Sequence, residues 1–168
     1  MAAGPTYEPI ATTTLTSNTS DYTFTSIPGT YTDLIVVCSN LKNTTTHTLC
    51  LRFNSDTSTN YSWTVIAGAL GSASSQRASN DSRGVAIGGY TEGLQSGTPG
   101  IYTGQVMNYS NSTTYKTCIA RGNNTNGEVE TIVGLWRSTA AITSITVRPS
   151  GGFMQSGTVL SLYGIKAA

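Results

Sequence analysis

Residues 129–165, VETIVGLWRSTAAITSITVRPSGGFMQSGTVLSLYGI, carry the clearest strand pattern in the chain. Successive side chains of 129–136 alternate between two faces, and each face carries apolar groups. A β-branched run follows at 142–147, and a proline and two glycines separate it from the apolar run 159–165. The pattern predicts a meander of three strands. Because the outer runs are apolar on both faces, we expect them to be covered on both sides, as in a two-sheet sandwich or a subunit interface.

Short apolar or β-branched runs bounded by turn residues recur through the rest of the chain. They predict strands at 10–15, 21–27, 31–39, 48–54, 61–67, 101–109 and 115–121. Residues 68–100 lose this pattern, and a long loop there would be a functional excursion or a contact surface. No segment keeps a helical period. The chain is therefore predicted to be all-β, with residues 10–168 forming a single antiparallel, jelly-roll-like β-sandwich.

The first nine residues, MAAGPTYEP, contain two prolines and no alternation of polar and apolar side chains. They predict an extended N-terminal arm, residues 1–9, that pairs with nothing inside its own domain. Such an arm would lie across a neighbouring subunit. Pro5, Tyr7 and Pro9 are the candidate assembly contacts.

Composition and charge exclude several classes of partner. The 168 residues have a net charge of +1, and only 10% of them are charged. The cationic residues are scattered singly, so the basic surface that nucleic-acid binding requires is absent. Residues 1–15 lack the features of a secretory signal, and no apolar run approaches the length of about 20 residues that spans a membrane. We therefore expect a soluble protein, made in a cytoplasm, with no nucleic acid or membrane as partner.

The three cysteines, Cys38, Cys50 and Cys118, each lie within an apolar run. An odd number of cysteines in such positions predicts small buried hydrophobes in a reducing compartment. The alternative is a disulfide between Cys38 and Cys50 on neighbouring strands.

Residue types that support catalysis are few. The single histidine, His47, lies in a Thr-rich stretch and is interpreted as a solvated loop residue. Glu128 and Glu130 share a strand face at a spacing that resembles glycosidase carboxylates, but charges that deter pairing at a sheet edge account for them more simply. Asp56 is expected to hydrogen-bond within its own turn. No zinc, calcium or phosphate-binding motif is present, so the sequence predicts no enzyme, no metal and no cofactor.

Aromatic residues flank or occupy the irregular region 68–100. Tyr61, Trp63, Tyr90 and Tyr102, with Asn and Ser neighbours, are candidates for receptor or intersubunit contacts, since exposed aromatics of this kind bind sugars. Packing within the core is the alternative. Trp136, next to Arg137, is interpreted as structural.

Five phrases of the chain are distinctive when taken together: YTFTSIPGTYTDLIVVCS (22–39), LRFNSDTSTNYS (51–62), NYSNSTTYKTCIAR (108–121), VGLWRSTAAITSITV (133–147) and SLYGIKA (161–167). Their order and wording resemble a β-rich module that recurs in virion structural proteins of tailed bacteriophages, including phages of cyanobacteria. The resemblance spans most of the chain from Tyr22 onward and includes no catalytic motif. It implies a trimeric component of the particle exterior.

Within that family, the short N-terminal segment favours a capsid decoration (cement) protein or a spike over a tail fibre, which carries a shaft before such a module. The expected partners are further copies of the chain and other virion proteins such as the major capsid protein. The competing function is a tail-fibre or baseplate protein whose aromatics bind host surface glycans. A depolymerase is the third alternative, and no convincingly placed acid pair supports it.

Overall fold

The computed structural model describes residues 6–90 and 93–166, and it confirms the all-β prediction. The strands are β1 Tyr7–Thr14, β2 Tyr22–Phe24, β3 Asp33–Leu41, β4 Leu49–Phe53, β5 Tyr61–Ala69, β6 Ser72–Asp81, β7 Val85–Gly88, β8 Gly100–Met107, β9 Lys116–Asn124, β10 Val129–Trp136, β11 Ile145–Pro149 and β12 Val159–Ile165. No helix occurs in these residues, and none of their segments is a helix able to cross a bilayer.

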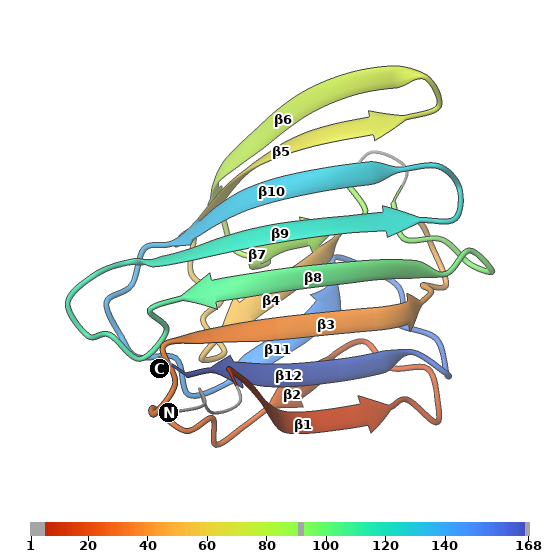
Figure 1. Cartoon of the computed structure of the whole chain (residues 1–168). Helices are drawn as coiled ribbons and strands as arrows, with labels where there is room; N and C mark the ends of the chain where they lie inside the picture. The colour runs from red at the N-terminus through yellow and green to blue at the C-terminus, as the bar shows by residue number, and fades with distance from the viewer. Residues whose placement is uncertain (1–5, 91–92, 167–168) are drawn as a thin grey trace.

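The strands form two antiparallel sheets packed face to face (Figure 1). The larger sheet has eight strands in the order β1-β12-β3-β8-β9-β10-β5-β6, and the smaller has four in the order β2-β11-β4-β7. The chain crosses repeatedly from one sheet to the other, as it does in jelly rolls. The predicted β-sandwich is therefore correct.

The predicted C-terminal meander is wrong, because its strands belong to different sheets. β10 and β12 lie in the large sheet, whereas β11 lies between β2 and β4 in the small one. Within one chain, β10 is covered by the other sheet on one face only, since Val129 and Val133 face outward and are exposed. The period of two identified the strands, but sheet membership depends on the path of the connecting loops.

The core fills the space between the sheets. An aromatic cluster of Phe53, Tyr61 and Trp136 links β4 of the small sheet to β5 and β10 of the large one. The rings of Tyr61 and Trp136 are stacked with centroids 6.3 Å apart, and the Phe53 ring lies 5.5 Å from that of Trp136. The Trp136 indole donates to Asp56 Oδ2 at 2.7 Å, so its polar edge is satisfied as well. The structural role expected of Trp136 is confirmed.

The predicted long loop at 68–100 contains two strands. β6 pairs with β5 across a turn at Leu70 and Gly71, both of which have positive φ. β6 is an edge strand whose side chains are exposed on both faces over most of its length, so no apolar alternation marks it in the sequence. β7 includes the short apolar run 85–87 and lies fully buried in the small sheet.

The predicted N-terminal arm is wrong for the residues that the structure describes. Tyr7, Glu8 and Pro9 pair with Ile165, Gly164 and Tyr163 of β12, and Glu8 forms an ion pair of 2.6 Å with Lys166. Proline is tolerated here because β1 is an edge strand, and the register shifts just after Pro9. Pro5 lies outside the described residues.

Candidate functional site

The largest candidate surface is the outer side of the eight-stranded sheet, which we call the broad face. Cross-strand pairing places Gln105, Ile119, Val133 and Thr64 in one row and Thr103, Arg121, Thr131 and Ile66 in the next. Most of the large hydrophobic side chains exposed by the described residues lie on it: Tyr7, Ile66, Ile101, Ile119, Val129 and Val133. The exposed fractions of Ile66 and Val129 reach 62% and 60%. Side chains that would suit a core therefore face solvent on this face.

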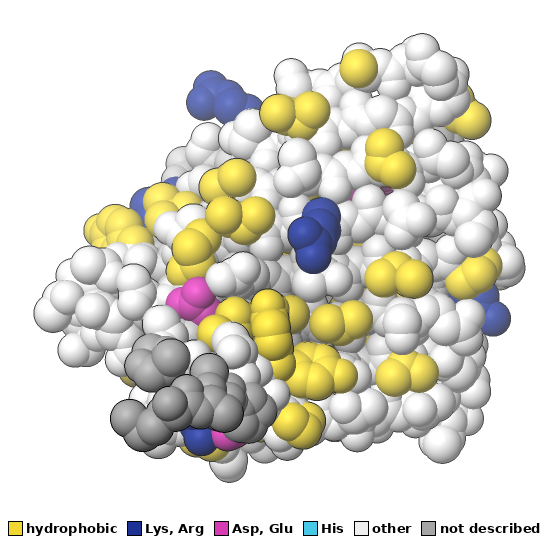
Figure 2. Space-filling view, in the orientation of Figure 1, with side chains coloured by type: hydrophobic (Ala, Val, Ile, Leu, Met, Phe, Trp, Pro, Cys, Tyr) yellow, Lys and Arg dark blue, Asp and Glu magenta, His cyan; other side chains and the backbone are white. Residues whose placement is uncertain are grey.

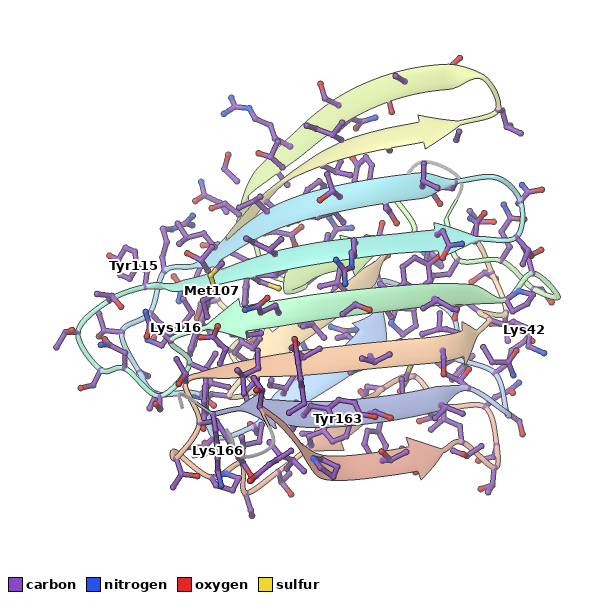
Figure 3. The ribbon with its side chains drawn as sticks, viewed as in Figure 1. Lys42, Met107, Tyr115, Lys116, Tyr163 and Lys166 are labelled. Atoms are coloured by element: carbon purple, nitrogen blue, oxygen red, sulfur yellow. The ribbon has the colours of Figure 1, made fainter. Side chains whose placement is uncertain are left out.

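Few charges interrupt the broad face. In Figure 2, hydrophobic side chains spread across it with isolated charged groups between them. On its four central strands β3, β8, β9 and β10, the outward charged side chains are Asp33 and Arg121. Asp33 accepts hydrogen bonds from Gln105 Nε2 at 2.8 Å and Asn108 N at 2.9 Å. Tyr163 of β12 adds a further aromatic ring near β1 (Figure 3).

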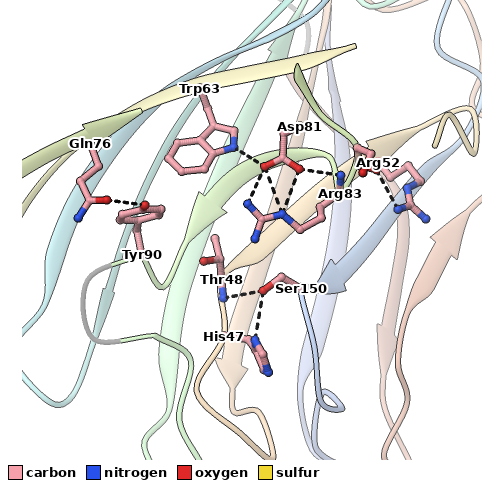
Figure 4. A network of polar contacts seen from close by, with 10 residues as sticks. His47, Thr48, Arg52, Trp63, Gln76, Asp81, Arg83, Tyr90 and Ser150 are labelled. Atoms are coloured by element: carbon pink, nitrogen blue, oxygen red, sulfur yellow. Dashed lines mark hydrogen bonds and ion pairs between the residues drawn. The ribbon is translucent and has the colours of Figure 1, made fainter. Parts of the chain in front are cut away.

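A second candidate site lies where β6, β7 and the loops beside β4 and β11 meet (Figure 4). Asp81 organises it: the carboxylate accepts from Trp63 Nε1 at 3.2 Å and from Arg83 Nη2 at 2.7 Å. Burial tends to raise the pKa of Asp81, but its hydrogen bonds and charge contact with Arg83 leave that pKa below the usual value. The guanidinium of Arg83 is thus held at a fixed position while about half of its side chain stays exposed.

An open pocket of about 230 Å³ adjoins Arg83, and we call it the His47 pocket. Its described lining is largely polar: Thr46, His47, Thr48, Arg83, Gly89, Tyr90, Gly93 and Ser150. The prediction that His47 is a freely solvated loop residue is wrong. Its Nδ1 lies 3.4 Å from Ser150 Oγ, and its ring packs on Gly151, where a Cβ would approach Nε2 to 2.5 Å.

The four aromatic candidates differ in how far the structure exposes them. Tyr61 and Tyr102 are fully buried, so their prediction as receptor or intersubunit contacts is wrong. Both rings point into the sandwich because alternate residues of β5 and β8 face the core. Trp63 is also buried and contacts Tyr90 edge to face, with ring centroids 4.8 Å apart. Only Tyr90, whose hydroxyl donates to Gln76 Oε1 at 2.6 Å, borders the solvent-accessible His47 pocket.

The two glutamates do not lie at a sheet edge, and that prediction is wrong. β10 lies between β9 and β5, and both Glu128 and Glu130 are buried. Glu130 accepts hydrogen bonds from the backbone N–H groups of Gly89 and Tyr90, while Glu128 accepts from Asn124 Nδ2 at 3.0 Å. Burial, and then the charge of Glu128, raise the pKa of Glu130 to about 7. These contacts anchor the chain after β7 to the large sheet, so a structural role accounts for the pair.

The cysteines are free and buried. Cys38 faces the core from β3, whereas Cys50 lies on the outer side of β4 in the other sheet, so they are not neighbours. Burial raises the pKa of all three thiols to about 12, which makes them poor nucleophiles. Within residues 6–90 and 93–166, no three His, Cys, Asp or Glu side chains gather closely enough to hold a metal ion.

Comparison with known proteins finds no matching family model and no matching curated protein. Solved structures with partial similarity include an exo-inulinase from Aspergillus awamori, at 13% identity and a TM-score of 0.35 over 95% of this chain and 29% of that one. A protein of unknown function from Shewanella oneidensis has 11% sequence identity and a TM-score of 0.23, over 85% of this chain and 62% of that one. An alginate lyase mutant in complex with alginate tetrasaccharide has 10% sequence identity and a TM-score of 0.30, over 94% of this chain and 80% of that one. The chain spans less than a third of the inulinase, and scores this low support no particular function.

Proposed function

We propose that this chain is a non-catalytic structural protein on the exterior of a bacteriophage particle, assembled as a homotrimer that decorates the capsid or forms a spike. The broad face is the observation that carries this proposal. Protein surfaces that remain exposed rarely combine so many β-branched and aliphatic side chains with so few charges, and depletion of charge is typical of interface cores. The resemblance to virion modules supplies the particle context.

The broad face is large enough for a stable interface. Its eight strands, spaced about 4.8 Å apart and extending for about 25 Å, give it an area on the order of 1,000 Å². A standard interface buries about 800 Å² on each partner. Because the face carries almost no charge of either sign, it suits another copy of itself better than a strongly charged partner. In the proposed trimer, three broad faces lean toward a common axis.

Placing the protein on the particle tests this function. Antibody labelling of intact particles, followed by electron microscopy, should show label distributed over the head, next to the major capsid protein. Label confined to the tail tip would instead support the receptor-binding alternative. Absence of the protein from purified particles would contradict both.

The receptor-binding alternative is favoured by a specific observation, the His47 pocket. It offers hydroxyl groups, an imidazole and the Tyr90 ring beside an exposed arginine, which are groups that bind sugars. As a second candidate function, we propose that the protein contacts host surface glycans through this pocket. The two functions use different surfaces, so they are compatible in one protein.

A further inference from the structure

We infer that the outer side of the four-stranded sheet, together with the His47 pocket, binds an acidic polysaccharide bearing carboxylate or sulfate groups. The inference deepens the second candidate function, and its failure would leave the proposed assembly through the broad face untouched. It begins with the arginine face, which we define as Arg52, Arg83 and Arg148.

Strand register brings these arginines together. On the β4–β11 pair, Arg52 lies opposite Thr146 and Arg148 lies opposite Cys50, so the two arginines are diagonal neighbours on the outer side of the sheet. Such positions are about 7–8 Å apart. Arg83 joins them from the residues before β7, the strand that pairs with β4 at Cys50. All three arginines act electrostatically on the buried Cys50 thiol, lowering its pKa against the larger effect of burial.

The positive charge of the arginine face is only partly balanced. Asp81 pairs with Arg83 through both carboxylate oxygens, while the described residues provide no ion pair for Arg52 or Arg148. Arg52 Nη2 donates to the carbonyl of Ser82 at 3.2 Å, and Asp21 contributes a weak attraction at longer range. The Nε atoms of Arg52 and Arg148 are buried and find no acceptor within residues 6–90 and 93–166.

This arrangement costs stability unless an anion completes it. Burial and the neighbouring Arg148 both lower the pKa of Arg52, which shows that its charge is held in an unfavourable position. Guanidinium groups bind carboxylate, sulfate and phosphate oxygens through paired N–H groups, and such bonds are stronger than neutral ones. The outer side of the small sheet is thus a built cationic surface that lacks an anionic partner among the described residues.

The adjoining pocket selects a saccharide among the possible polyanions. Arg83 belongs both to the arginine face and to the lining of the His47 pocket, so the two surfaces are continuous. The pocket contributes the hydroxyl groups of Thr46, Thr48 and Ser150. These groups match sugar hydroxyls, and the Tyr90 ring matches the apolar face of a pyranose, whereas an acidic peptide would leave them unused.

The test measures binding of the full chain to dextran sulfate, polygalacturonate, unmodified dextran and poly-L-glutamate by biolayer interferometry. We expect binding to at least one acidic polysaccharide and none to dextran. The double variant Arg52→Gln/Arg148→Gln should bind roughly tenfold or more weakly, since each guanidinium makes charge-assisted hydrogen bonds. The matched control Lys42→Gln/Arg77→Gln removes the same charge elsewhere and should change affinity by less than about twofold.

Equal weakening in the two double variants would overturn the inference, because it would show an effect of net charge alone. Binding to dextran as tight as to dextran sulfate would also overturn it, as would binding to poly-L-glutamate without binding to any polysaccharide. Thermal unfolding of each variant verifies its fold. If Arg52→Gln/Arg148→Gln no longer unfolds cooperatively, the affinities of the single variants Arg148→Gln and Arg77→Gln are compared in the same way.

Discussion

Glu130 places an ionisable carboxyl group at the junction between the large sheet and the chain after β7. It is 6% exposed, and its oxygens accept from the backbone of Gly89 and Tyr90. Its pKa of about 7 in the folded protein lies above the ordinary glutamate value of 4.5. The folded protein therefore keeps a proton at this site over a range of pH in which the unfolded chain has released it.

The stability associated with Glu130 is present below pH 4.5 and is lost as the pH rises through about 7. Glu130→Gln should remove this dependence, so the free energy of unfolding of the variant, relative to the wild type, should rise between pH 5 and pH 8. The expected rise is on the order of 3 kcal/mol. Urea denaturation at the two pH values measures it.

Glu8→Gln is the matched control. The Lys166 ammonium lowers the pKa of the partly exposed Glu8 through a hydrogen bond, so this variant should show no such rise. A relative stability of Glu130→Gln that stays constant from pH 5 to pH 8 would contradict the account of the Glu130 site.

The pKa of Asp56 is shifted in the opposite direction to that of Glu130. Burial tends to raise its pKa, but hydrogen bonds from Trp136, Asn60 and Ser58 lower it to about 2. Asp56→Ala should lower the free energy of unfolding at pH 7 by about 2 kcal/mol, because the Trp136 indole N–H loses its acceptor. Since the folded pKa is depressed, the difference from wild type should shrink as the pH falls from about 4 toward 2.

Urea denaturation at pH 7 and pH 2.5 tests the Asp56 prediction. Asp21→Ala, which removes an exposed carboxylate, should have little effect at either pH. An Asp56→Ala variant as stable as the wild type at pH 7 would show that the Trp136 indole does not depend on this carboxylate.

At the residue scale, the sequence predicted which residues form strands better than it predicted which are buried. Tyr61 and Trp63 lie in the strand predicted at 61–67, yet both residues belong to the core. The turn role of Asp56 was predicted, and its oxygen does accept from the backbone N–H of Ser58 at 2.8 Å. The proximity of Arg52 and Arg148 was missed, because it arises only through the pairing of β4 with β11.

At the scale of elements, the close approach of the sheets depends on Gly134 in β10. A Cβ at this position would lie 2.1 Å from Val85 Cγ1 of β7. Both residues are buried, so the added atom has no space. The glycine in the first quoted stretch thus lets the small sheet pack against the centre of the large one.

Gly134→Ala should therefore lower the free energy of unfolding by about 1–3 kcal/mol. Val85→Ala in the same chain should restore part of the loss, because it removes the methyl groups that the new Cβ meets. Gly68→Ala is the matched control, since Gly68 is also in a strand but its nearest side-chain contact would be an ordinary 3.7 Å. Equal destabilisation by Gly134→Ala and Gly68→Ala would show that strand glycines in general, and not this contact, set the effect.

Elements with apolar alternation were predictable from sequence, and the others were not. β10 and β12 were located within a few residues, because their period of two is clear. β6 was missed because its sequence, SASSQRASND, contains no apolar side chain larger than alanine. The strand is held in the sheet by backbone pairing with β5. The order of strands was not predicted, since it depends on contacts between segments far apart in the chain.

At the scale of the whole molecule, the sandwich has two dissimilar outer surfaces. The broad face is apolar and nearly uncharged, whereas the outer side of the small sheet carries the arginine face. The apolar residues on both faces of 129–136 predicted a strand covered on both sides, and in the structure the outward side chains of Ile119 and Val133 are paired and exposed. The two proposals accordingly use different surfaces: self-assembly through the broad face, and ligand binding through the arginine face and the His47 pocket.

The central claim is that the broad face is covered by other copies of the chain, and light scattering coupled to gel filtration tests it most directly. At micromolar concentration the wild-type protein should have three times the mass of a single chain. Ile119→Lys/Val133→Lys should have the mass of one chain with an unchanged circular dichroism spectrum, because charges in the row of paired side chains oppose burial. The control Thr57→Lys/Thr125→Lys, with the same added charge on exposed loops, should remain trimeric. A wild-type protein with the mass of a single chain at these concentrations would contradict the claim.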